Sequence, residues 1–92
     1  MGDIAVVKGA LGTSGRVDVF LTNDSGAVLQ RWAPPGGPWY GGAITGSGAH
    51  ANAVPVVFLD GNTIDLYVEG SSTGTVLECW WDGSWHSQTI NP

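Results

Sequence analysis

The sequence has few charged residues, hardly any basic side chains and a single cysteine. Of its 92 residues only 12% are charged, and three basic against eight acidic residues give a net charge of −5. Lys8, Arg16 and Arg31 are too few to neutralise a phosphate backbone, so nucleic acid is not expected as a partner. The lone Cys79 excludes an intrachain disulfide framework and a cysteine-based metal cluster. We expect no metal and no other cofactor.

The chain also lacks a long apolar run. No stretch approaches the length of a membrane span, and the start Met1-Gly2-Asp3 does not resemble a signal peptide. We therefore expect no membrane insertion. The compartment stays open, and a cytoplasmic location with release by a non-classical route is compatible with these features.

Glycine, by contrast, is abundant. Fifteen glycines and five prolines stand in a chain that is 42% hydrophobic. This combination is typical of short strands joined by tight turns, because a disordered chain would be poorer in apolar residues. At this length, residues 1–92 form a single domain.

The second half of the chain repeats the order of features found in the first. The segment VDVF at 17–20 resembles IDLY at 64–67, and GAVLQRW at 26–32 resembles GTVLECW at 74–80. Trp39-Tyr40 corresponds to Trp85-His86. We interpret this as an internal duplication with one repeat in residues 1–46 and the other in 47–92.

Alternating apolar and polar residues between turn signals predict eight short strands and no helix. We expect these strands at 4–7, 16–21, 27–33, 39–44, 54–59, 64–69, 75–81 and 85–90. Four antiparallel strands per repeat match one propeller blade. The predicted fold is thus all-β, with two four-stranded blades per chain. Two blades cannot close a ring, so we expect closure of the β-propeller by oligomerisation, as a dimer, trimer or tetramer.

The densest cluster of aromatic residues lies at 74–86. Trp80, Trp81 and Trp85 flank the pair Asp82-Gly83, which is a strong signal for a hairpin turn. Three tryptophans at a turn are hard to bury. A flat, partly apolar ligand is expected to bind there.

In these motifs the chain resembles the fucose-binding β-propeller lectins, especially the bacterial two-repeat type, and also the related seven-bladed bacterial lectins. The best local matches are WYGGA at 39–43 and ECWWDGSW at 78–85. The resemblance implies a homotrimer that closes a six-bladed ring. It also implies pockets between blades that bind the fucose-like or mannose-like ends of glycans, so that the ring is multivalent.

The resemblance also assigns roles to residues. It makes Glu78 the carboxylate that accepts hydrogen bonds from sugar hydroxyls, with Gln30 in the matching place of repeat one. Trp81 and Trp85 become aromatic walls, and Trp39 matches Trp85. The family's site arginine is absent from both repeats, and Ala33 replaces one tryptophan, so two sites of unequal strength are expected. The expected sugar-binding residues are Asp18, Gln30, Trp39, Tyr40, Gly42, Ala43, Asp65, Glu78, Trp81 and Trp85.

The chemistry of sugar recognition is compatible with this set. A monosaccharide has a C–H face that packs on an aromatic plane and a rim of hydroxyls that needs fixed polar partners. A carboxylate makes charge-assisted hydrogen bonds to those hydroxyls. Trp32 and Trp80 are expected in the core. For Asp18 and Asp65 a structural hydrogen bond to the next blade and a sugar contact remain equally open.

Three other interpretations were weighed. A glycosidase needs a carboxylate pair such as Asp65 and Glu78, but the duplicated design favours equal binding sites, so we do not expect an enzyme. The segment Asp60–Asp65 departs from a calcium loop after two ligands. A structural or protein-interaction propeller, natural or engineered, is the serious alternative, and displacement by free monosaccharide distinguishes it from a lectin.

Overall fold

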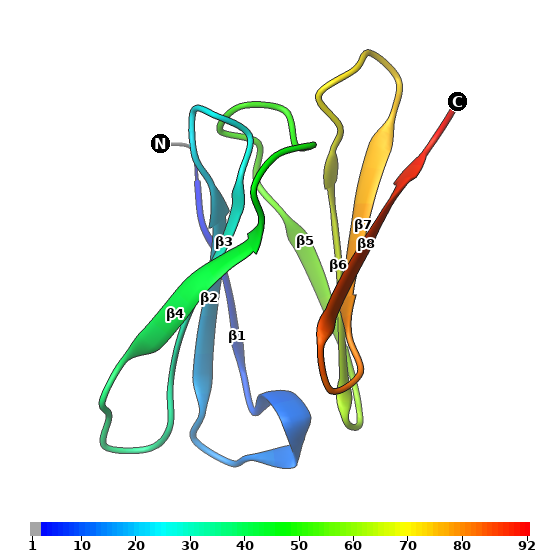
Figure 1. Ribbon diagram of the computed structural model, residues 1–92. Helices are drawn as coiled ribbons and strands as arrows, with labels where there is room; N and C mark the ends of the chain where they lie inside the picture. Colours follow the sequence, from blue (N-terminus) through cyan, green and yellow to red (C-terminus); the bar gives the residue numbers. More distant parts are fainter. Residues whose placement is uncertain (1–2) are drawn as a thin grey trace.

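A computed structural model describes residues 3–92 and shows an all-β chain with one short 3-10 turn, η1 (Figure 1). Met1 and Gly2, on which part of the signal-peptide expectation rests, lie outside the described residues. No helix within 3–92 is long and apolar enough to cross a bilayer. The elements are β1 (Ala5–Lys8), η1 (Ala10–Gly12), β2 (Val17–Thr22), β3 (Val28–Ala33), β4 (Tyr40–Thr45), β5 (Val56–Asp60), β6 (Thr63–Glu69), β7 (Val76–Trp81) and β8 (Trp85–Ile90).

The strands form two separate four-stranded sheets, one from each half of the chain. Their orders are β1-β2-β3-β4 and β5-β6-β7-β8, and all neighbours are antiparallel. The expectation of eight strands in two sets of four is confirmed. The largest difference in a boundary is at β5, which begins at Val56 because Pro55 has no N–H to offer a ladder.

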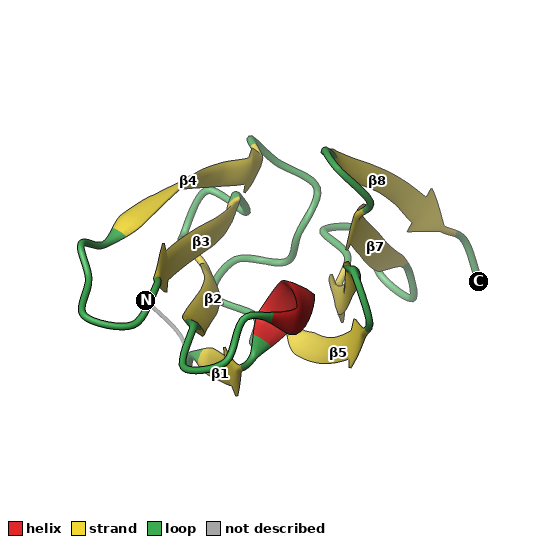
Figure 2. Cartoon of the chain, turned by 90° about the horizontal axis from the view of Figure 1, so that it is seen from below, coloured by secondary structure: helices red, strands yellow, loops and turns green. Residues whose placement is uncertain are grey.

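The two sheets pack face to face and splay apart, as the view along the strands shows (Figure 2). The first strands, β1 and β5, contact one another on the closed side, where η1 contacts β5 and β6. The last strands, β4 and β8, lie at the open side. The connection 46–55 carries the chain from β4, the edge strand on the open side of the first sheet, to β5, the edge strand on the closed side of the second.

Strict alternation in β2 and β6 builds the core between the sheets. Phe20 of β2 and Leu66 of β6 have no exposed surface, while the residues beside them in the chain face outward. Cys79 of β7 is also fully buried, and this burial raises the pKa of its thiol to about 11. It is therefore a neutral, small apolar residue at neutral pH, as expected.

The two sheets present opposite faces to one another. The face of the first sheet that packs on the second carries Asp18, Phe20 and Gln30. Their counterparts in the repeat include Tyr67 and Glu78, which lie on the face of the second sheet that points away from the first. The face of the first sheet that carries Asp18, Phe20 and Gln30 therefore packs on the second sheet, whereas the equivalent face of the second sheet points away from the first. Two units related by a rotation, and not by a two-fold axis, pack in this way.

Candidate functional site

A small cavity lies where the two sheets meet near the end that carries η1. Its volume is about 100 Å³. The first half of the chain contributes Leu11, Arg16, Gln30 and Trp32, and the second half contributes Ile64, Trp81 and Trp85. Both sheets are needed to form it.

Trp85 connects the two sheets at this cavity. Its Nε1 donates to Gln30 Oε1 at 3.3 Å, and its ring meets Phe20 edge-on at a centroid distance of 6.1 Å. Trp81 lies across the β7–β8 hairpin from Trp85, with ring centroids 5.7 Å apart. The turn is closed by Gly83, whose φ of 121° is accessible mainly to glycine. Trp81 and Trp85 both line the cavity.

The polar side of the cavity is an ordered chain of hydrogen bonds in the first sheet. Arg16 donates to both oxygens of Asp18, from Nε at 2.7 Å and from a terminal nitrogen at 3.0 Å. Gln30 Nε2 donates to Asp18 Oδ2 at 3.0 Å. Because Asp18 has no exposed surface, it cannot touch a ligand. It is a positioning residue for Arg16 and Gln30, and its hydrogen bonds stay within its own sheet instead of reaching the next one.

Four residues of the cavity were not among the predicted site residues: Leu11, Arg16, Trp32 and Ile64. Arg16 was treated as one of three scattered cations, and Trp32 was expected in the core. The Arg16 guanidinium carbon lies 4.1 Å from the centroid of the Trp32 ring, and both side chains line the cavity. The signal available was period-two alternation, since Arg16 precedes Asp18 by two residues on the same face of the strand.

Glu78 lies elsewhere, on the outer face of the second sheet. Its carboxylate accepts from Tyr67 Oη at 3.0 Å and from Gln88 Nε2 at 2.7 Å. The carboxylate raises the pKa of Tyr67, because it accepts the hydroxyl's hydrogen bond and repels the phenolate. Asp65 shares this face. The expectation that Glu78 shares a pocket with Trp81 and Trp85 is therefore wrong within one chain, because alternation places residues 78 and 81 on opposite faces.

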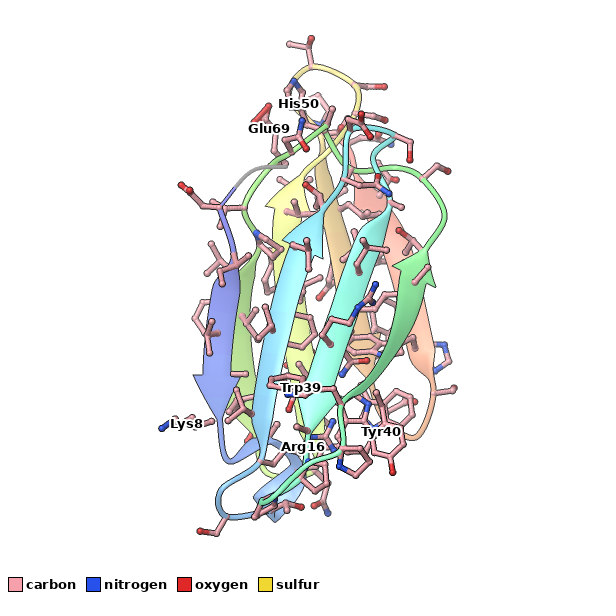
Figure 3. The ribbon with its side chains drawn as sticks, turned by 90° about the vertical axis from the view of Figure 1, so that its left-hand side faces the viewer. Lys8, Arg16, Trp39, Tyr40, His50 and Glu69 are labelled. Carbon is pink, nitrogen blue, oxygen red and sulfur yellow. The ribbon has the colours of Figure 1, made fainter. Side chains whose placement is uncertain are left out.

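The residues of 39–43 divide between the two faces of the first sheet. Tyr40 stacks on Trp32 with centroids 4.8 Å apart, and Gly42 pairs with Gln30 across β3 and β4. These two lie on the cavity side. Ala43 pairs with Leu29 on the other side, and Trp39, just before β4, is 59% exposed (Figure 3). Trp39 is therefore not a wall of the cavity described above.

A cluster of catalytic residue types in the β7–β8 hairpin does not form a relay. Asp82 Oδ1 and Ser84 Oγ lie 2.9 and 3.3 Å from the same atom, His86 Nε2. A nucleophile–base–acid triad needs the two partners on different ring nitrogens. The His86 ring also stacks on Trp80, with centroids 5.3 Å apart. Trp80, expected in the core, is half-buried on the outer face.

The segment Asp60–Asp65 is a hairpin turn. Asp60 pairs with Thr63, whose hydroxyl donates to the Asp60 carbonyl at 2.8 Å. Within residues 3–92, no three His, Cys, Asp or Glu side chains gather as ligands for a metal ion.

Comparisons of the chain with protein families, with curated proteins and with solved structures find no match. The functional argument therefore depends on the geometry of the site.

Proposed function

We propose that the chain is a carbohydrate-binding lectin related to the fucose-binding β-propeller lectins, and that its two sheets are propeller blades. The observation that carries the proposal is the cavity between the sheets, where Trp81 and Trp85 form walls beside the fixed polar groups of Gln30 and Arg16. Such a site suits one edge of a monosaccharide, which presents a C–H face and a polar rim, while the rest of the ring lies outside the cavity.

A second site follows if another copy of the chain packs in the same way as the two sheets do. The outer face of the second sheet carries Glu78 and Asp65, the counterparts of Gln30 and Asp18, together with the exposed side chain of Phe58. The free face of the first sheet borders Trp39, the counterpart of Trp85. In a head-to-tail ring these two faces meet, and Trp39 of one chain approaches Glu78 of the next.

Three chains then close a six-bladed propeller. The ring holds one site within each chain and one between chains, so weak individual sites act together on a glycan-bearing surface. The acceptor oxygens of Glu78 suit the adjacent hydroxyls of fucose-like and mannose-like sugars. Binding, without chemical conversion, is the proposed activity.

Titration calorimetry with L-fucose and D-mannose, without added metal, tests this function. We expect heat from at least one of these sugars. Glu78→Ala should weaken binding at the site between chains at least about ten-fold, equivalent to about 1.4 kcal/mol. Trp85→Ala should weaken binding by the same factor at the site within the chain. Asp24→Ala is the control for Glu78, because Asp24 is an exposed acidic residue in the turn between β2 and β3, beyond the strands that form the two faces.

The experiment also distinguishes the main alternative. If no sugar produces heat while the protein is folded and oligomeric, the tryptophans serve packing, and a structural or protein-interaction propeller replaces the lectin. If Asp24→Ala weakens binding as much as Glu78→Ala does, the assignment of the second site is wrong.

A further inference from the structure

Arg16 supplies hydrogen-bond donors to the cavity between the sheets. A guanidinium has five N–H groups. Two of them are used by Asp18, at 2.7 and 3.0 Å, so three remain. One face of the group is covered by Trp32 at 4.1 Å, and the side chain is 12% exposed where it borders the cavity. The free N–H groups can therefore reach a ligand in that space.

Gln30 adds a donor, and its neighbours determine how its amide is oriented. Nε2 faces the Asp18 carboxylate at 3.0 Å, and Oε1 faces the indole N–H of Trp85 at 3.3 Å. The opposite orientation would place oxygen against the carboxylate and N–H against N–H. One N–H of Nε2 is left over. This N–H and the free N–H groups of Arg16 make the polar wall of the cavity rich in hydrogen-bond donors and poor in acceptors.

The rest of the cavity is apolar and narrow. Leu11, Ile64, Trp81 and Trp85 form its walls. The volume of about 100 Å³ is well below the roughly 300–1,000 Å³ of pockets that enclose a whole small molecule. The space fits one substituent of a sugar better than a complete ring.

The charge of the site favours a neutral substituent. The Arg16 guanidinium is balanced by the Asp18 carboxylate, with which it makes a bidentate pair. The chain as a whole has a net charge of −5, which repels anions. A carboxylate on the ligand would therefore gain little here, whereas a carbonyl oxygen would accept hydrogen bonds without a charge penalty.

We infer that the cavity between the sheets selects an N-acetylated hexosamine and holds its acetamido group. The carbonyl oxygen of that group accepts from Arg16 and Gln30, and its methyl packs against Leu11 and Ile64. The sugar ring lies against Trp85. This inference depends on the proposed lectin function and names the ligand class of one of its two sites.

The outer face of the second sheet has the opposite character. Thr63 stands where the repeat has Arg16, and Glu78 stands in place of Gln30. The Glu78 oxygens can only accept hydrogen bonds, so that half-site suits hydroxyl groups. The duplication has thus produced two sites of different specificity on one chain.

Calorimetry with N-acetylglucosamine, glucosamine and glucose tests the inference on the intact protein. These sugars differ only at one carbon. We expect N-acetylglucosamine to bind at least ten-fold more tightly than glucose, and glucosamine to bind no better than glucose. In the ¹H–¹⁵N spectrum the indole resonance of Trp85 should move with N-acetylglucosamine.

Two substitutions test whether the acetamido group binds in the cavity between the sheets. Arg16→Lys keeps the charge beside Asp18 but removes the planar fork of donors, and should weaken N-acetylglucosamine about ten-fold. Leu11→Phe fills the apolar end of the cavity without touching the polar chain, and should have a similar effect. Arg31→Lys is the matched control for this cavity, because Arg31 lies on the opposite face of β3. That face meets the next chain in the proposed ring, so the mass of this variant is measured alongside. The affinity of Arg31→Lys for N-acetylglucosamine should equal that of the wild type.

Equal affinities for N-acetylglucosamine and glucose, or equal affinities in Arg16→Lys and Arg31→Lys, would overturn the inference. L-fucose is measured in parallel. If fucose binds and the acetamido group brings no gain, the ligand assignment is wrong and the lectin function stands. If no sugar binds, both fail.

Discussion

Asp18 and Asp65 occupy matching positions in the two repeats but have different environments. Asp18 is completely buried and accepts three hydrogen bonds, two from Arg16 and one from Gln30. Asp65 is partly exposed and lies on the outer face of the second sheet. The same residue type thus holds the polar wall of a cavity in one repeat and faces outward in the other.

This difference predicts unequal effects of the same substitution. Asp18→Asn leaves the Arg16 guanidinium without its counter-charge in a largely buried place, and should lower the free energy of unfolding by about 3 kcal/mol. Asp65→Asn should change it by no more than about 0.5 kcal/mol. Denaturant unfolding of the two variants measures both values. Equal destabilisation would show that the Arg16–Asp18 pair does not stabilise the fold.

At the scale of elements, the turn between β2 and β3 fastens the first sheet to the connection between the sheets. Gly26 in this turn has φ +81°, and its carbonyl accepts from the N–H of Ala49 at 3.1 Å. A Cβ on Gly26 would collide with the carbonyl oxygen of Ala49. The N–H of Asn52 donates to the carbonyl of Asn23 in the same turn at 3.1 Å. Gly26 therefore serves both the backbone conformation and the close approach of two segments.

A comparison with Gly36 separates the effect of the backbone conformation from the effect of the close approach. Gly36 has the same φ of +81°, but a Cβ there would meet no atom within 4 Å. Gly36→Ala should cost about 1 kcal/mol for the left-handed conformation alone. Gly26→Ala should cost about 3 kcal/mol, because the collision adds to the strain. Thermal and denaturant unfolding of the pair measure the difference. If the two variants are equally stable, the contact between the turn and Ala49 is unimportant.

At the scale of the whole molecule, the exposed apolar side chains lie mainly where a second copy would pack. Phe58 and Val56 are 56% and 55% exposed on the outer face of the second sheet. Val6 is 53% exposed on the free face of the first sheet. Large apolar patches on both sides of a two-sheet unit are costly in water, and head-to-tail association would cover both.

Phe58→Asp tests this association. It places a charge beside Asp65 in the proposed junction and should convert the trimer, with three times the 9.5 kDa mass of one chain, into monomers. Light scattering after gel filtration measures the mass. Thr73→Asp is the control, because Thr73 is exposed in the loop between β6 and β7 and should leave the trimer intact. A wild-type mass of one chain would contradict the proposed ring.

Much of the architecture could be predicted because it depends on local signals. Period-two alternation in 17–22 and 64–69, with glycine-containing turns between strands, determines where strands lie and which residues share a face. The hairpin around Gly83 is likewise local. For these reasons the eight strands, their grouping in fours and the hairpin that carries Trp81 and Trp85 could be predicted from the sequence.

Which residues line the cavity could not be predicted from such local signals. Alternation along the strand separates Glu78 from Trp81, yet the resemblance grouped both in one pocket. The strand places them on opposite faces, and Trp85 instead meets Gln30, a residue from the other sheet. Arg16 was missed because nothing in the sequence indicates that the start of β2 borders the second sheet.

The sequence by itself therefore determined the secondary structure, the duplication and the two faces of each strand, because these depend on neighbours a few residues apart. Only the tertiary structure decided which face of the first sheet meets which face of the second. That choice depends on the complementary packing of Phe20 and Val28 against Ile64, Leu66 and Cys79, between segments some forty residues apart. The site belongs to that junction, so its composition is a property of the packed sheets.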